Sequence, residues 1–231
     1  IKNINFSLNS GEWLGVIGPN GSGKSTLIKG ILGIINPVKG NIFVNDKDIN
    51  IFTKKRISQT ISFLPQQLNT KLSITVRELV ALGRSPYKKF WEFDLNKSDL
   101  EKINECLNLV DLYDFKDNLI NQISGGQCQR AYLAMALAQD PEILILDEPT
   151  NALDLKYQIK FLEIVKTLKV SRNISVITIL HDLNLAARYS DKIIALKNGK
   201  SIGYGTSNTL INEKFIKNIF DIDASVSYTH L

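Results

Sequence analysis

Short apolar runs, each followed by turn-forming or polar residues, alternate with stretches of helical periodicity along this chain. Runs of this length without regular polar alternation are typical of strands that are buried on both faces of a sheet. The runs are Trp13–Ile17, Ile42–Val44, Ile61–Leu64, Ile143–Leu146, Ile174–Leu180 and Ile193–Leu196. Because helices separate several of these strands, the pattern predicts an α/β fold with a mainly parallel sheet.

Helix and turn signals occupy the spaces between the runs. A glycine-rich loop and a predicted helix over Lys24–Ile35 follow the first strand, and Asn36 and Pro37 should end that helix. Near the other end of the chain, Gly199 predicts a hairpin turn and Asn208–Asp221 predicts a terminal helix. The chain is therefore expected to begin with a strand, a loop and a helix, and to end with a hairpin and a helix.

The stretch 75–140 differs from the rest because it lacks convincing strands and has helical periodicity instead. Ser98 and Glu101 have the spacing of a capping box. The apolar residues after this point fall on one face of a helix, namely Leu100, Ile103, Leu107 and Val110. We therefore predict a helical lobe inserted into an α/β core.

These signals predict one domain with two lobes. Residues 1–74 and 141–206 would form the core lobe, residues 75–140 the helical lobe and residues 207–225 a C-terminal helix. Residues 226–231 resemble the translation of a transposon adapter used in sequencing libraries, so we expect them to be a non-native tail. At the other end, Ile4, Phe6 and Leu8 alternate as if already inside a strand, which predicts that residues upstream of Ile1 are missing.

Composition narrows the class of protein without naming a function. A chain of 231 residues with 44% hydrophobic and 22% charged residues can bury a substantial core, which argues against disorder. It has no apolar stretch long enough to span a membrane and no leader pattern, so a cytosolic protein is expected. Cys106 and Cys128 fit no metal or disulfide spacing. The net charge of +5 is spread over isolated lysines, so it is compatible with a nearby nucleotide or membrane surface but indicates neither in particular.

The strongest chemical motif lies between the first strand and the first helix. Two glycines with four residues between them, followed by Lys and Ser, fit the phosphate-loop pattern, in which backbone N–H groups and a helix N-terminus bind phosphate oxygens. Lys24 would place its charge on the β and γ phosphates, and the Ser25 hydroxyl would bind Mg²⁺. The predicted nucleotide-binding residues here are Gly18, Pro19, Asn20, Gly21, Ser22, Gly23, Lys24, Ser25 and Thr26. The alternative, a flexible glycine loop, does not account for the strand before it and the helix after it.

Two further motifs follow buried strands and should emerge at the edge of the sheet where open α/β folds bind ligands. Asp147 would hold Mg²⁺, and Glu148 would polarise the water that attacks the γ phosphate. Taken alone, this pair could also be a solvated acidic turn, because Asp-Glu-Pro is common in turns. His181 follows another strand and could contact the γ phosphate, although a lone histidine at a strand end is more often structural.

The order of the motifs resembles the ATP-binding cassette ATPase family across nearly the whole chain. The shared features are the phosphate loop, Leu64-Pro65-Gln66-Gln67, Ser124-Gly125-Gly126-Gln127, Asp147-Glu148-Pro149-Thr150, Ala152-Leu153-Asp154 and His181. The resemblance implies a P-loop core with an inserted helical lobe, ATP and Mg²⁺ as cofactors, and catalytic roles for Lys24, Glu148 and His181. It also implies that two cassettes form a homodimer.

The resemblance assigns further roles residue by residue. Gln66 would sense Mg²⁺ and the attacking water, and would link the nucleotide to the helical lobe. Ser124, Gly125, Gly126 and Gln127 form the signature segment, which would complete the ATP site of the partner cassette. Asp154 would communicate across the dimer interface. Mg²⁺ would be held by Ser25, Gln66 and Asp147.

The sequence departs from the family pattern at two places. Ile123 stands where leucine usually precedes the signature serine, a volume-conserving change that should be tolerated. The aromatic residue that usually stacks on adenine lies upstream of the position equivalent to Ile1, so nucleotide affinity is expected to be reduced.

Two segments carry a closer resemblance, which indicates the class of compound that is transported. The segments Thr75–Tyr87 and His181–Tyr189 resemble the subgroup that powers importers of iron-siderophores, haem and cobalamin. That subgroup implies two transmembrane permease subunits, which dock in a groove beside the Gln66 loop and the helical lobe, and indirectly a substrate-binding protein. It implies a peripheral position on the cytoplasmic face of the bacterial inner membrane and no nucleic-acid partner. The alternatives are an exporter cassette, a soluble non-transport cassette ATPase, and a nucleotide-binding module without turnover, which the presence of the catalytic residues disfavours.

Overall fold

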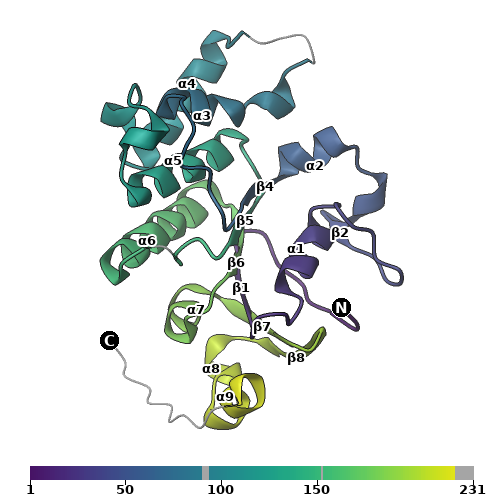
Figure 1. Ribbon diagram of the computed structural model, residues 1–231. Helices are drawn as coiled ribbons and strands as arrows, with labels where there is room; N and C mark the ends of the chain where they lie inside the picture. Colours follow the sequence, from purple (N-terminus) through teal and green to yellow (C-terminus); the bar gives the residue numbers. More distant parts are fainter. Residues whose placement is uncertain (90–93, 152, 222–231) are drawn as a thin grey trace.

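A six-stranded, mainly parallel sheet forms the centre of the molecule and confirms the predicted α/β class (Figure 1). The computed structural model describes residues 1–89, 94–151 and 153–221. The strands of this sheet are β1 (Trp13–Ile17), β4 (Ile61–Leu64), β5 (Ile143–Asp147), β6 (Ser175–Ile179), β7 (Lys192–Lys197) and β8 (Lys200–Gly205). Their order is β4-β5-β6-β1-β7-β8, and only the β7–β8 pair is antiparallel.

The apolar runs form strands because both faces of the sheet are covered. In β1, Trp13 and Ile17 belong to one hydrophobic core, whereas Leu14 and Val16 belong to the other. Successive residues of a strand point to opposite faces, so a strand that contributes to two cores must be apolar throughout. All five residues of β1 are buried.

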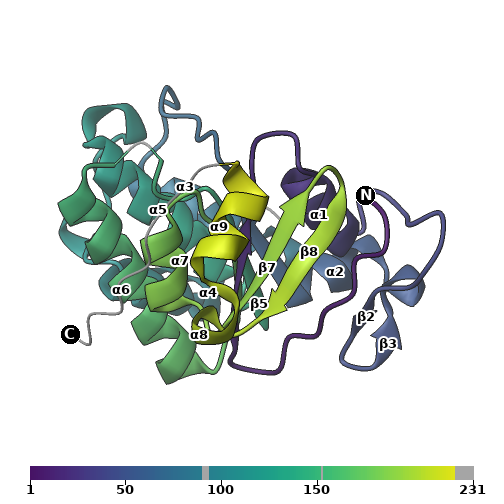
Figure 2. The ribbon, with the colours of Figure 1, turned by 90° about the horizontal axis from the view of Figure 1, so that it is seen from below.

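Helices cover the two faces of the sheet, as the view from below shows (Figure 2). On one side lie α3 (Val76–Leu82), α4 (Lys97–Leu109), α5 (Gly125–Ala138), α6 (Leu155–Arg172) and α7 (Leu183–Tyr189). On the other side lie α1 (Lys24–Ile31), α2 (Lys54–Thr60) and a small hairpin of β2 (Phe43–Val44) and β3 (Lys47–Asp48). The phosphate-loop helix and the helices of the segment 75–140 are therefore on opposite faces of one sheet.

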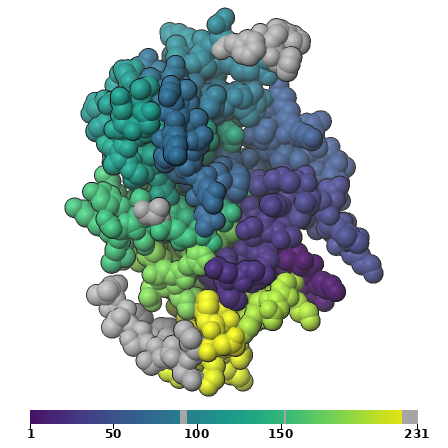
Figure 3. All heavy atoms as spheres, in the orientation of Figure 1, coloured from purple at the N-terminus to yellow at the C-terminus, as the bar shows by residue number. Residues whose placement is uncertain are grey.

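The segment 75–140, called the helical segment below, contains α3, α4 and α5 and no strand among its described residues. The helical segment lies at one end of the molecule, with the C-terminal helices at the other (Figure 3). Short 3-10 turns connect or precede its helices, and a further one precedes α2: η1 (Ile49–Ile51), η2 (Ser85–Tyr87), η3 (Tyr113–Phe115) and η4 (Ile120–Gln122).

The capping box expected at Ser98 and Glu101 is wrong by two residues. The N-cap of α4 is Asn96, whose side chain accepts a hydrogen bond from the Asp99 N–H at 2.9 Å, while Asp99 Oδ2 accepts from the Asn96 N–H at 3.2 Å. Asparagine and aspartate can form the same reciprocal pair that serine and glutamate form. Of the four apolar residues assigned to one helical face, Leu100 is 40% exposed, and the other three are fully buried.

Two predicted helices end or break earlier than expected. The helix predicted over Lys24–Ile35 stops at Ile31, because Gly33 takes a left-handed conformation (φ 65°) and the Ile34 N–H bonds to the Lys29 carbonyl at 2.9 Å. The single helix predicted over Asn208–Asp221 is two helices, α8 (Ser207–Leu210) and α9 (Glu213–Phe220). The break lies at Asn212, whose side chain accepts the Phe215 N–H at 2.9 Å and starts the second helix.

The run Ile42–Val44 is not a buried strand of the main sheet. Its last two residues form β2, which pairs antiparallel with β3, and Phe43 is 61% exposed. Asn45 and Asp46 have positive φ values of 51° and 59°, which suits the tight turn of a two-residue hairpin. The hairpin expected at Gly199 is present between β7 and β8.

The structure also bears on four other features noted in the sequence. Ile4, Phe6 and Leu8 are partly buried against the core on the α1 side of the sheet, but they form no strand. Cys106 and Cys128 are free and buried. Residues 226–231 lie outside the described residues. No helix in the described part of the chain has the length and apolar content needed to cross a membrane.

Candidate active site

The phosphate loop connects β1 to α1 at the centre of the sheet. Gly18, Gly21 and Gly23 have φ values of 147°, 74° and 104°, which side chains rarely allow. A Cβ atom on Gly18 would lie 2.1 Å from the carbonyl oxygen of Leu196 in β7. The loop therefore requires glycine both for its backbone conformation and for its close approach to the sheet.

Lys24 lies in the first turn of α1 with its amine turned back to the loop. Its Nζ donates hydrogen bonds to the carbonyl oxygens of Gly18 at 2.8 Å and Pro19 at 3.1 Å. Burial lowers the pKa of Lys24, and the charges of Glu148 and Asp147 oppose that shift. The amine is thus already fixed within the loop and close to two carboxylates.

The loop also carries polar groups that suit an anion. The Ser22 hydroxyl oxygen is buried and has no partner among the described residues. The next hydroxyls, Ser25 and Thr26, are exposed at the start of α1. A buried hydroxyl without a partner is costly, so this arrangement fits a phosphate that would accept its hydrogen bond.

The acidic pair stands at the carboxyl end of β5. Asp147 is the last residue of the strand, and its pKa is raised by burial first and then by the charge of Glu148, while Lys24 and His181 act in the opposite direction. Glu148 follows in a left-handed conformation with φ 50°, which is uncommon for a residue with a side chain. The turn thereby directs a carboxylate out of the end of the sheet.

Three side chains meet at the carboxylate of Glu148. Gln66 and Asn151 donate hydrogen bonds from their amide nitrogens to Glu148 Oε2. His181 Nε2 is paired with Glu148 Oε1. Gln66 follows β4 and His181 follows β6, which are the two neighbours of β5 in the sheet. Parallel strands place their carboxyl ends at one edge, and this is why residues far apart in sequence converge here.

The signature segment forms the N-terminus of α5. The Ser124 side chain accepts the Gln127 N–H at 3.3 Å, and Gln127 Oε1 accepts the Ser124 N–H at 2.8 Å. A Cβ on Gly126 would lie 3.8 Å from Leu153 and 3.9 Å from Tyr157, whereas one on Gly125 would meet nothing within 4 Å. Within the described part of the chain, no hydrogen bond joins this segment to the phosphate loop.

Asp154 is the N-cap of α6, next to the signature segment. Its backbone carbonyl accepts the N–H groups of Tyr157 at 2.8 Å and Gln158 at 3.0 Å, but its side chain makes no capping hydrogen bond. The residue is exposed. Its carboxylate therefore faces solvent at the surface of the single chain.

The sequence-predicted residues thus fall into two groups. The phosphate loop, Asp147, Glu148, Gln66 and His181 lie at the carboxyl edge of four adjacent parallel strands, whereas the signature segment and Asp154 lie on the surface beside α5 and α6. Asn151 was not predicted. Its only sequence signal is its position three residues after Glu148 in a turn, and that spacing has no specific meaning until the turn is known.

The geometry favours phosphoryl chemistry. A buried cation, a loop with backbone N–H groups at a helix start, and two adjacent carboxylates suit the charge that develops when a γ-phosphoryl group is transferred to water. Within the described residues, no cluster of three or more His, Cys, Asp or Glu side chains could hold a metal ion without other ligands. Magnesium does not require such a cluster, since it is commonly bound through one or two carboxylates together with substrate phosphates.

Comparison with known proteins identifies the family. The ABC transporter family matches residues 1–151. A curated relative, the petrobactin import ATP-binding protein of Bacillus anthracis, is 36% identical over 98% of this chain and 83% of its own length.

Solved structures agree with the sequence comparison. A structure assigned to a metal-chelate type ABC transporter in an inward-facing conformation superposes with a TM-score of 0.85 at 29% identity, covering 95% of this chain and 83% of the other. A dimeric ATP-binding cassette in a post-hydrolysis state with ADP and Pi has a TM-score of 0.75 at 31% identity, covering 90% of each chain. The chain described here therefore belongs to the ABC transporter family, as an ATP-binding cassette that hydrolyses ATP.

Proposed function

We propose that this cassette powers an importer and couples ATP hydrolysis to the uptake of an iron-siderophore, haem or cobalamin-type chelate. The observation that carries the hydrolytic part is the convergence of Gln66 and His181 on Glu148 at the sheet edge that also bears the phosphate loop. The chelate is supported by the similarity to a petrobactin import protein and to a metal-chelate type transporter.

Each residue has a defined part in hydrolysis. The loop amides and Lys24 bind the phosphates and stabilise the charge that builds on the γ-phosphoryl group. Glu148 accepts a proton from the attacking water while the water oxygen bonds to the γ-phosphorus and the bond to the ADP oxygen breaks. His181 stabilises the γ-phosphoryl oxygens. These roles use groups that already lie together in the structure.

Magnesium is proposed to be held by Ser25, Gln66 and Asp147. Hydroxyl, amide and carboxylate oxygens are the hard ligands that this ion prefers. When bound, the ion neutralises phosphate charge during transfer.

A second copy of the chain is proposed to complete each ATP site. The signature segment of Ser124, Gly125, Gly126 and Gln127 would close on the partner's nucleotide, and Asp154 would cross the interface. Two observations support this arrangement: the segment is not hydrogen-bonded to its own phosphate loop within the described residues, and a related cassette is dimeric. Gly125 is exposed with open space around it, so a phosphate could approach its backbone closely.

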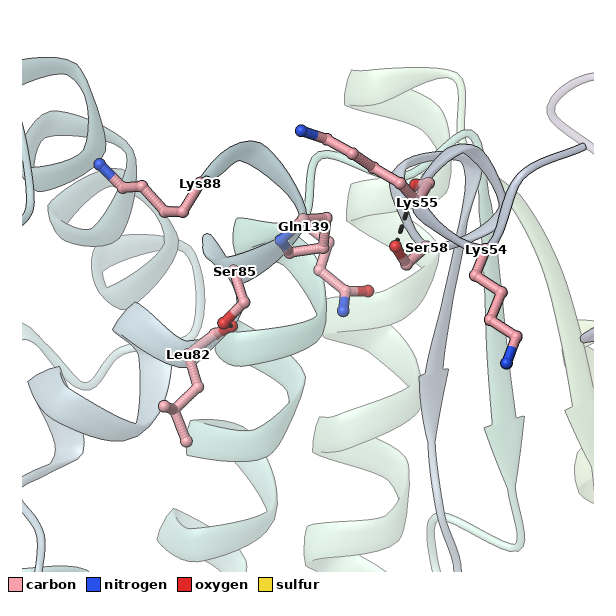
Figure 4. A pocket seen from close by; sticks show the side chains of 8 residues that line it. Lys54, Lys55, Ser58, Leu82, Ser85, Lys88 and Gln139 are labelled. Atoms are coloured by element: carbon pink, nitrogen blue, oxygen red, sulfur yellow. Dashed lines mark hydrogen bonds between the residues drawn. The ribbon is translucent and has the colours of Figure 1, made fainter. Parts of the chain in front are cut away.

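The permease subunits are proposed to dock between α2 and the helical segment, beside the strand that leads to Gln66. An open hollow of about 540 Å³ lies there (Figure 4). It is lined by Lys54, Lys55, Ser58, Leu82, Ser85, Pro86, Lys88 and Gln139. Leu82 is 54% exposed and offers an apolar contact within this mainly polar lining. Docking there would place the chain peripherally on the cytoplasmic face of the bacterial inner membrane, with a substrate-binding protein acting through the permease.

Replacing Glu148 tests the hydrolytic assignment. The Glu148→Gln variant should bind Mg-ATP with near-normal affinity, lose hydrolysis by about a thousandfold or more, and form a nucleotide-dependent dimer in size-exclusion chromatography with light scattering. Glu101→Gln is the matched control, because Glu101 is an exposed residue of α4 whose side chain pairs with the exposed Lys97 at 4.0 Å. Unchanged turnover in Glu148→Gln would sink the general-base role.

Reconstitution tests the transport assignment. The cassette with a chelate-importer permease in vesicles should hydrolyse ATP faster when the loaded binding protein is added, and should accumulate labelled chelate. Leu82→Asp at the proposed docking hollow should lower this stimulation without lowering the ATPase activity of the isolated cassette. If the binding protein stimulates Leu82→Asp as strongly as the unchanged chain, the permease does not dock at this hollow.

A further inference from the structure

The turn after β5 contains Asn151, whose hydrogen bonds to other described residues go to Glu148. The Asn151 backbone N–H points to the Glu148 carbonyl oxygen at 3.4 Å, and the Asn151 side-chain amide donates to Glu148 Oε2. Glu148 has a left-handed backbone, which neighbouring interactions must maintain. Asn151 therefore fixes both the backbone and the carboxylate of the same residue.

The three donors to the Glu148 carboxylate differ in where they are attached. Gln66 follows β4 and His181 follows β6, so each contacts Glu148 from a strand that neighbours β5. Asn151 belongs to the same turn as Glu148, only three residues away. A donor in the same turn moves with the carboxylate, whereas donors from other strands can move independently of it.

In the proposed function, Gln66 and His181 also have roles toward the nucleotide. In that function Gln66 faces Mg²⁺ and His181 faces the γ phosphate. The single hydrogen on His181 Nε2 cannot donate fully to Glu148 and to a phosphate oxygen at once, so His181 is expected to weaken its hold on Glu148 when nucleotide binds. Gln66 could keep its Nε2 contact with Glu148 only where that contact is compatible with the direction in which its Oε1 binds Mg²⁺. The amide of Asn151 has no second partner among the described residues.

We propose that Asn151 is a positioning residue that holds the Glu148 carboxylate in its orientation toward the attacking water. This inference rests on the proposed function, because it presupposes that Glu148 is the general base. Asn151 transfers no proton itself. It limits the rotation of the carboxylate during the catalytic step, when Gln66 and His181 are engaged with the nucleotide.

The closing experiment is steady-state ATPase kinetics on the full chain. Asn151→Ala should lower kcat about tenfold or more, leave KM for ATP nearly unchanged and leave nucleotide-dependent dimer formation intact. Asn151→Ser keeps a short hydrogen-bond donor and should recover part of the lost rate. Asn45→Ala is the matched control, since Asn45 donates to Glu142 at 2.6 Å in an exposed pair between the β2–β3 turn and the residue before β5.

The outcomes separate the two assignments. If Glu148→Gln retains turnover, Glu148 is not the general base, and the positioning role of Asn151 is overturned as well. If Glu148→Gln abolishes turnover while Asn151→Ala has normal kcat, only the positioning role is overturned. A fall in kcat accompanied by loss of the dimer, with no recovery in Asn151→Ser, would show a structural role instead. Support also requires that Asn151→Ala has no further effect on the residual rate of Glu148→Gln.

Discussion

At the scale of single residues, the active site keeps groups in environments that are unfavourable for folding. Lys24 is buried with a lowered pKa, Asp147 has a raised pKa, and Glu148 has a left-handed backbone. Residues that satisfied only the needs of folding would avoid such positions. On the proposed function, Mg-ATP would supply partners for these groups, so its binding is expected to offset these costs.

Asp147 provides a direct test of this view. The pKa of Asp147 is higher in the folded chain than in the unfolded chain. Between these two pKa values the folded chain therefore binds more protons than the unfolded chain. The free energy of unfolding consequently falls as the pH rises through this range. The Asp147→Asn variant lacks this penalty. Its Tm without nucleotide should therefore exceed that of the unchanged chain at pH 7.

Thermal unfolding as a function of pH and ligand checks this expectation. The difference in Tm should shrink as the pH is lowered toward the ordinary pKa of aspartate, where Asp147 is protonated in both states. Added Mg-ATP should raise the Tm of the unchanged chain more than that of Asp147→Asn. A variant that is less stable than the unchanged chain at pH 7 would contradict the argument.

At the scale of elements, the start of α4 depends on one buried carboxylate. Asp99 caps the helix and pairs with Arg84 at 2.9 Å and with Lys88. Burial alone would raise the pKa of Asp99, but the hydrogen bonds from Lys88 and Arg84 together with Asn96 outweigh it and hold the pKa below its ordinary value. The side chain of Asp99 is 3% exposed, so the pair is largely removed from water.

Asp99→Asn should therefore destabilise the chain by about 3 kcal/mol, because it leaves buried cations without their counter-charge. Urea unfolding measures this change, and the loss should disappear as the pH falls through the lowered pKa, where Asp99 is protonated in the unchanged chain as well. Ser98→Ala is the control and should change stability by less than about 0.5 kcal/mol. A loss of about 1 kcal/mol in Ser98→Ala would mean that Ser98 caps the helix after all.

The bounds of the strands and helices show which features of the fold the sequence pattern predicts. Strands β1, β4 and β5 were predicted to within one residue, because burial on both faces demands uninterrupted apolar runs. Helix ends were predicted less well, since they depend on a single backbone conformation such as that of Gly33 or a single cap such as Asn212. The strand pattern predicted that Glu148 and His181 lie at the same edge of the sheet, and the family resemblance added Gln66. The pairing of Gln66 and His181 with the Glu148 carboxylate was not predicted, because strand order is not encoded locally. Asn151 could not be predicted without the turn that carries it.

At the scale of the whole molecule, a charged cluster joins the helical segment to the core. Arg172 at the end of α6 pairs with Glu105 of α4 and lies 3.9 Å from Asp140, which follows α5. Lys102 pairs with both acids, at 3.5 Å and 2.5 Å. The two acids are about half exposed, so the cluster is accessible to salt.

Arg172→Ala should lower the free energy of unfolding by about 1 kcal/mol at low ionic strength, as expected for a partly exposed network. The loss should become smaller in 1 M NaCl, where charges are screened over about 3 Å. Lys166→Ala, at an exposed position of the same helix, should have little effect. A loss that is the same at both salt concentrations would show that Arg172 contributes through packing rather than charge.

The contact between the phosphate loop and the β7–β8 hairpin affects how nucleotide binding is driven. Gly18 lies against the Leu196 carbonyl, and the Ser22 carbonyl accepts the Gly199 N–H at 3.0 Å. A loop fastened in this way has little conformational entropy left to lose. The Gly199 N–H, which donates to the loop, should therefore exchange slowly with deuterated solvent even in the nucleotide-free chain. The main cost of binding phosphate should be dehydration of the loop rather than its ordering.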